Sequence, residues 1–138
     1  MIGGLIVAIW QVEFYFKLNG QSDISSIFIP QDSFNKLLPV LSVGKSWNDD
    51  LTVYGELDST CVCVWKNSNS FEISCRLDVS SVKREEINAI IDFAKANNLM
   101  IVYTEQTFLP TYNNIFKILI DSPAFRFVRD PSLFLNNM

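Results

Sequence analysis

Carboxylates, cysteines and one Gly-Lys-Ser sequence are the groups in this chain that could do chemistry. The densest set of carboxylates lies within residues 49–58, which contain no Lys or Arg: Asp49, Asp50, Glu56 and Asp58. Paired carboxylates can act as acid and base in sugar hydrolysis, and an uninterrupted run of them creates a field that attracts cations. The chain has no histidine, so it lacks the commonest general base and zinc ligand.

Two other motif-like sequences lack the spacing that their chemistry requires. The Gly-Lys-Ser sequence at 44–46 matches the end of a phosphate-binding loop, but Pro39 occupies the place of the earlier glycine. A thiolate metal site built from the three cysteines would need a fourth ligand, and residues two apart on a strand merely share a face. We therefore expect no metal and no cofactor, and three buried core thiols: Cys61, Cys63 and Cys75.

Length and charge narrow the class of protein. With 138 residues, of which about half are apolar, we expect one globular domain over 1–138, with 1–9 as a less ordered extension. The net charge of −4 has the wrong sign for neutralising phosphates, so we expect no direct contact with nucleic acid. Three cysteines, an odd number, favour the reducing cytoplasm. The apolar run at 1–10 is too short to span a membrane.

Hydrophobic periodicity predicts a sheet. Alternating apolar residues predict a long strand over 5–18 and a short one over 26–29. Three segments separated by turn-forming residues predict an antiparallel meander: 51–57, 60–66 and 70–79. In the last of these, apolar and polar residues alternate, so we expect the sheet to have one buried face and one polar, solvated face.

Helices are predicted around this meander. A short helix beginning at Asp32 or Ser33 is limited by Pro39. A longer amphipathic helix begins at Ser80 or Ser81 and ends at 97–98, followed by a strand over 99–104. A further helix begins near 110–111. The predicted fold class is α+β, with two layers in which helices pack on one face of a mostly antiparallel sheet.

The second half of the chain resembles a family of bacterial proteins. The resemblance is carried by Arg-Leu-Asp-Val at 76–79, by Ile-Ile-Asp-Phe-Ala at 90–94, and by the tail at 121–135, which reads DSPAFRFVRDPSLFL. Over about residues 47–135, this overall pattern resembles small bacterial immunity proteins that accompany polymorphic or contact-dependent growth inhibition toxins. The resemblance implies a cytoplasmic protein, not an enzyme, that binds a cognate toxin domain, often a nuclease with a basic cleft, and blocks substrate access.

The binding surface is inferred from the residues and not from the family. Carboxylates on the polar sheet face would extend the acidic run at 49–58 into one negative surface, bordered by two aromatic residues. Such a surface attracts a basic protein and mimics the phosphates of its substrate, while aromatic residues serve as central anchors. The predicted partner-binding residues are Trp47, Asp49, Asp50, Tyr54, Glu56, Asp58, Glu72 and Asp78.

Two functions from other classes remain open at this point. In a small ligand-binding domain or hydrolase, Glu56, Glu72 or Asp78 would converge on a pocket with a partner base. In a self-associating structural subunit, exposed apolar residues of the first strand would pair two chains: Trp10, Phe14 and Phe16.

Overall fold

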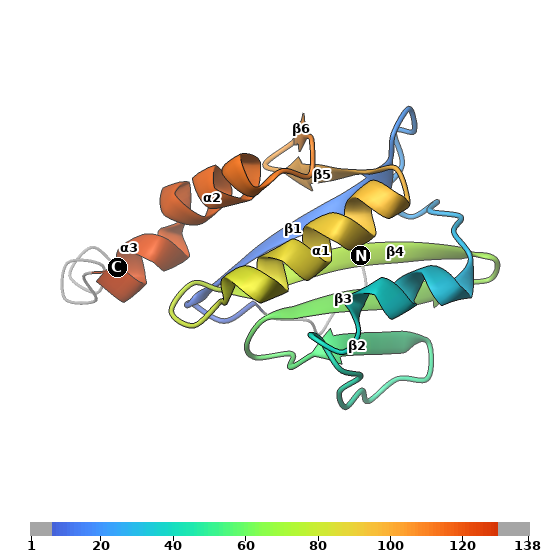
Figure 1. Cartoon of the computed structure of the whole chain (residues 1–138), viewed down its shortest axis with the longest axis horizontal. Coiled ribbons are helices and arrows are strands. Elements are labelled where there is room, and N and C mark those ends of the chain that lie inside the picture. The colour runs from blue at the N-terminus through green and yellow to red at the C-terminus, as the bar shows by residue number, and fades with distance from the viewer. Residues whose placement is uncertain (1–6, 130–138) are drawn as a thin grey trace.

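A computed structural model describes residues 7–129 of the chain and shows an α+β fold with two layers (Figure 1). The predicted fold class is confirmed. Six strands form one antiparallel sheet in the order β2-β3-β4-β1-β5-β6. The strands are β1 (Gln11–Leu18), β2 (Leu51–Gly55), β3 (Cys61–Asn67), β4 (Ser70–Asp78), β5 (Leu99–Tyr103) and β6 (Gln106–Phe108).

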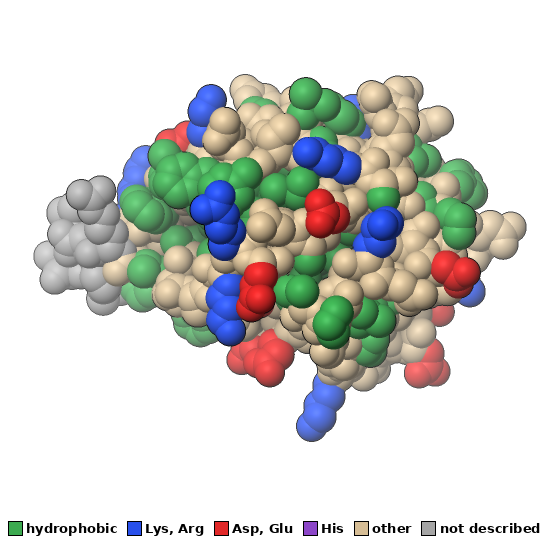
Figure 2. Space-filling model, viewed as in Figure 1, with side chains coloured by type: hydrophobic (Ala, Val, Ile, Leu, Met, Phe, Trp, Pro, Cys, Tyr) green, Lys and Arg blue, Asp and Glu red, His purple; other side chains and the backbone are tan. Residues whose placement is uncertain are grey.

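The helices cover one face of this sheet, and positive, negative and hydrophobic side chains are interspersed on the surface seen from that side (Figure 2). The 3₁₀ helix η1 and the helix α1 lie side by side over it, and α2 and α3 follow beyond β5 and β6 (Figure 1). None of the helices within residues 7–129 is long and apolar enough to cross a membrane. Their bounds are η1 Gln31–Leu37, α1 Arg84–Ala96, α2 Tyr112–Asp121 and α3 Pro123–Arg129.

The main core fills the space between the helices and the sheet. Alternate residues of β1 face it, because successive side chains of a strand point to opposite faces: Val12, Phe14 and Phe16 are all buried. Phe34 of η1 lies at the centre, with its ring 5.5 Å from that of Phe93 on α1 and 5.1 Å from that of Phe71 on β4. Aromatic packing therefore joins η1, α1 and the sheet.

The meander and the later elements agree with the sequence predictions, but several boundaries differ. The first strand begins at Gln11 and not at residue 5; residues 7–10 are not strand, and residues 5–6 lie outside the described part. The segment 26–29 makes only one bridge to the sheet, between Ile27 and Phe71. β6 was not predicted, because its two-residue turn uses Thr104 and Glu105 at positive φ and not the usual Asn-Gly.

The long helix α1 begins at Arg84, three or four residues later than predicted. Residues 79–82 form a turn first, which two hydrogen bonds to Asp78 close. The Asp78 carboxylate accepts the backbone N–H of Ser80 at 3.0 Å, and the Asp78 carbonyl accepts the backbone N–H of Val82 at 2.8 Å. Glu86 then accepts a hydrogen bond from the backbone N–H of Lys83 at 2.8 Å and so caps the helix. Glu86 therefore marks the start of α1, whereas Ser80 and Ser81, from which the helix was predicted to begin, belong to the preceding turn.

Candidate functional site

The acidic run at 49–58 lies at one edge of the sheet, where the fold divides it into two pairs. Asp49 and Asp50 precede β2, and Glu56 and Asp58 follow it; all four side chains are exposed. β2 is an edge strand of five residues, which separates its ends by about 17 Å. The four carboxylates therefore mark the two ends of one edge strand and do not form a single patch.

The two pairs have different electrostatic surroundings. Lys45 lies in the same loop as the first pair, and the backbone N–H of Lys66 donates to the carbonyl of Asp50 at 2.8 Å. Both lysines are exposed and their backbones lie close to this pair, so we expect them to offset part of its charge. At the other end, Glu56 lines a cavity together with Glu86 of α1. The negative field is therefore expected to be stronger at the Glu56 end.

The loop that carries Glu56 and Asp58 is held from the start of β1. The indole N–H of Trp10 donates to the carbonyl of Asp58 at 2.9 Å, and the amide of Gln11 donates to the carbonyls of Leu57 (3.0 Å) and Ser59 (2.5 Å). These contacts join residues far apart in sequence, so sequence reasoning missed them. They fix the backbone on which the two carboxylates are displayed.

Asp78 was predicted to be an exposed surface carboxylate, but the structure shows that it is buried. It is 8% exposed, and its carboxylate accepts hydrogen bonds from the hydroxyls of Ser80 (2.6 Å) and Ser59 (3.4 Å). Its backbone N–H donates to the hydroxyl of Thr60 at 3.1 Å. The physical reason is that the strand ends here and turns toward α1, so the side chain is used to close the turn. Asp78 thus positions the acidic loop and is not displayed beside it.

The two aromatic residues predicted at the rim lie on opposite faces of the sheet. Tyr54 is buried in the main core, where its ring stacks on Phe34 at 5.9 Å, so the prediction that it borders the acidic surface is wrong. Trp47 is 58% exposed and packs edge-on against Trp65 of β3 at 6.3 Å. Trp47 is therefore a large aromatic residue available to a partner beside the acidic edge, and it is more exposed than Trp10.

The face of the sheet opposite the helices was predicted to be solvated, but it carries buried residues. Arg76 is 1% exposed, and its Nε lies 3.0 Å from a carboxylate oxygen of Glu13, its neighbour across β1 and β4. Beside this ion pair is a second apolar cluster: Leu51, Val53, Cys61, Cys63 and Trp65. The ion pair is needed here because a buried charge must be paired. The alternation in the sequence correctly placed Arg76 on this face, but it did not reveal that Arg76 is buried.

Glu72 lies on this same face but away from the other predicted site residues. It is half-buried, and burial, followed by the charges of Asp23 and Glu13, raises the pKa of its carboxyl group. Six positions separate it from Asp78 on β4, or about 20 Å along the strand. The continuous negative surface through Glu72 and Asp78 is therefore not present.

The tyrosine of this face provides a test of its burial. Burial, then the charges of Glu13 and Glu72, raises the pKa of Tyr15 to about 12. Because the folded state favours the neutral phenol, the stability it contributes is present below pH 10 and is lost as the pH rises toward 12. We expect tyrosinate absorbance to show a late step near pH 12, in the range where the protein begins to unfold. Tyr15→Phe should reduce the amplitude of that step by one tyrosine; an unchanged amplitude would contradict the assignment.

The three cysteines are free and buried, as predicted from the strands that contain them. The Sγ atoms of Cys61 and Cys63 are 3.8 Å apart, and the hydrogen bond between these thiols, with burial, raises the pKa of Cys61. Burial raises the pKa of Cys75 well above the ordinary value. Cys61 and Cys75 are therefore expected to react slowly, whereas the same hydrogen bond with Cys61 lowers the pKa of Cys63. Within residues 7–129, no group of three or more metal-ligating side chains could hold a metal ion.

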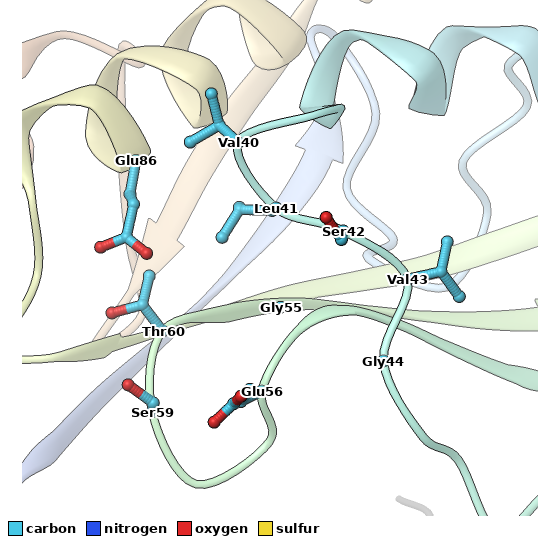
Figure 3. Close-up of a pocket in the computed structure, with 10 residues that line it drawn as sticks. All are labelled: Val40, Leu41, Ser42, Val43, Gly44, Gly55, Glu56, Ser59, Thr60 and Glu86. Atoms are coloured by element: carbon cyan, nitrogen blue, oxygen red, sulfur yellow. The ribbon is translucent and has the colours of Figure 1, made fainter.

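A cavity of about 350 Å³ lies beside the Glu56 end of β2 (Figure 3). It is lined by the strap 40–44, by Glu86 of α1, and by four residues at and after the end of β2: Gly55, Glu56, Ser59 and Thr60. The strap follows the outer edge of β2 through hydrogen bonds from Gly44 to Val53 and from Gly55 to Ser42, both 2.7 Å. A side chain at Gly44 would collide with the carbonyl oxygen of Gly55, so this glycine permits the close approach.

A second cavity, of about 470 Å³, lies between the β5–β6 hairpin and α2. Its lining includes Tyr103, whose pKa is raised by burial and by the charge of Asp121. Lys117 and Asp121, one helical turn apart on α2, both line it. Opposite charges at this spacing compensate each other, so this cavity has no single charge preference.

Comparison with protein families, with curated proteins and with solved structures found no match to this chain. The feature of this structure that bears on function is the acidic edge, which comprises Asp49, Asp50, Glu56 and Asp58, with Trp47 beside it.

Proposed function

We propose that this protein is an immunity protein that binds a cognate bacterial toxin domain and neutralises it. The proposed toxin is a basic domain, such as a nuclease, whose cleft is covered by the acidic edge. One observation carries the proposal: four exposed carboxylates are displayed at the two ends of an edge strand, with the exposed indole of Trp47 beside them. The resemblance over about residues 47–135 to small immunity proteins supports the same class.

The acidic edge has two tasks in this mechanism. Its carboxylates pair with Lys and Arg of the toxin, in place of the phosphates of its substrate, and accelerate association. Trp47 is buried on binding and prolongs the complex, because a large aromatic group loses water at the centre of the interface. Trp10, Gln11 and Asp78 contribute indirectly, since they hold the loop that displays Glu56 and Asp58.

Two observations favour this proposal over the functions left open by the sequence. Glu56 lines the cavity beside β2, whereas Asp78 is used in its turn and Glu72 lies elsewhere on the sheet, so the three carboxylates do not converge on one concavity. Phe14 and Phe16 are fully buried in the core and cannot pair two chains. Of the three residues in that alternative, only Trp10 is exposed, and its indole N–H is bonded to the carbonyl of Asp58.

Co-expression with the product of the gene immediately upstream tests the proposed function. We expect a stoichiometric complex that survives purification, and an upstream product that stops growth when expressed without this protein. Growth should recover when both proteins are present. A non-toxic upstream product that forms no complex would refute the immunity function.

A further inference from the structure

The cavity beside β2 has walls of two different kinds. One side is apolar and is formed by the strap, where Val40 and Val43 are 40% and 61% exposed and Leu41 is buried. The other side is polar: Figure 3 shows Glu86 reaching from α1 toward Thr60, with Ser59 and Glu56 on the turn below. An apolar wall next to carboxylates and hydroxyls suits a ligand with an aliphatic stem and a cationic head.

Hydrogen bonds hold Glu86, Thr60 and the backbone of the turn in place before any ligand arrives. Glu86 accepts the backbone N–H of Lys83, which fixes its carboxylate over the cavity. The Thr60 hydroxyl accepts the backbone N–H of Asp78, and the turn is closed by a bond from Ser59 N–H to the carbonyl of Glu56 at 2.9 Å. Acceptors that are already ordered lose less entropy on binding.

We propose that this cavity is a socket for one arginine side chain of the toxin; this inference rests on the proposed function and deepens it. The aliphatic stem lies along the strap at Val40, whose side chain faces the side of Glu86 in Figure 3, and the guanidinium donates to the carboxylates of Glu56 and Glu86. A volume of about 350 Å³ is at the small end of ligand sites, which span about 300–1,000 Å³, so it suits one side chain. The site adds a desolvated anchor to the acidic edge.

The lining chemistry selects this occupant. Among the described residues that line the cavity, the charged ones are Glu56 and Glu86, so the cavity disfavours anions. A guanidinium offers five N–H donors in one plane and can bond two carboxylates and nearby hydroxyls together. The larger cavity at α2 differs because Lys117 there supplies its own cation.

Titration with N-acetyl-arginine methylamide tests the socket without the toxin. We expect saturable amide shifts in the NMR spectrum of the ¹⁵N-labelled protein, centred on the strap and on the turn after β2. The citrulline analogue has the same shape but no charge, and it should bind about tenfold more weakly or less. Absence of saturable shifts at the cavity, or equal binding of citrulline, would overturn the proposal.

Two double variants with the same charge change separate the socket from the general field. Glu56→Gln with Glu86→Gln removes both cavity carboxylates, and glutamine retains the helix cap because it too can accept the Lys83 N–H. Asp92→Asn with Glu85→Gln removes two exposed carboxylates of α1 that do not line the cavity. We expect the first pair to weaken binding of the arginine probe about tenfold and the second to change it less than twofold; equal effects would overturn the socket.

The probe and the toxin give independent readouts. If the toxin binds but the first double variant leaves its affinity and the probe titration unchanged, the socket is wrong and the immunity function stands. If the probe binds at the cavity but no toxic partner is found, the cavity is confirmed as an arginine site and the immunity function falls.

Discussion

Replacing Glu13 by alanine is expected to lower the free energy of unfolding by about 3–5 kcal/mol. The guanidinium of Arg76 is 1% exposed and lies 3.0 Å from the Glu13 carboxylate, so the substitution takes a counter-charge from a buried cation. Removing one partner of a buried pair costs more than the pair itself contributes, because the remaining charge stays desolvated. The effect is on folding and should reduce binding only through the loss of folded protein.

Urea denaturation at neutral pH measures this effect. Glu85→Ala is the matched control, because it removes an exposed carboxylate from the first turn of α1 and should cost about 1 kcal/mol or less. Glu13→Gln keeps an acceptor for the guanidinium and should give an intermediate loss. If Glu13→Ala were no more destabilising than Glu85→Ala, the ion pair would contribute little to stability.

The buried ion pair also shows what the alternation of a strand can and cannot predict. The pattern in β4 assigned Arg76 and Asp78 correctly to the face opposite the core, because side-chain direction along a strand is a local property. Whether that face is solvated depends on elements that arrive from elsewhere in the chain. The prediction of a polar face was therefore right about the direction in which the Arg76 and Asp78 side chains point, and wrong about their exposure to solvent.

The fold class and the three-stranded meander could be predicted for the same local reason. Hydrophobic alternation and turn residues lie within a few positions of one another, and the order of strands in the meander follows from its short connections. The insertion of β1 between β4 and β5 depends on long-range pairing, which no local pattern encodes. The start of α1 was misplaced because serine favours turns as well as helix caps.

The candidate site could be predicted only in part. The four exposed carboxylates of the acidic edge were found from their sequence alone, because they flank a strand in polar loops. Tyr54 could not have been excluded, because alternation in β2 places it opposite Leu51 and Val53, and both faces of this strand prove to carry buried residues. Glu86 could not have been added, because only the packing of α1 over the sheet brings it to the turn after β2.

Charge reversal at the Glu56 end is expected to slow association with the toxin more than reversal at the Asp50 end. For Glu56→Lys with Asp58→Lys, we expect the association rate at low salt to fall by about tenfold to a hundredfold. For Asp49→Lys with Asp50→Lys the fall should be smaller, because Lys45 and Lys66 already offset that pair. Both variants change the net charge equally, so the comparison isolates position.

Stopped-flow mixing with the toxin recovered by co-expression measures these rates at several salt concentrations. The difference between the variants should shrink as salt rises, because ions screen charges beyond about 10 Å at 0.1 M. Trp47→Ala should raise the dissociation rate and change the association rate little, because packing of this side chain sets the lifetime of the complex. Equal rates for both charge reversals would mean that net charge, and not the geometry of the acidic edge, attracts the partner.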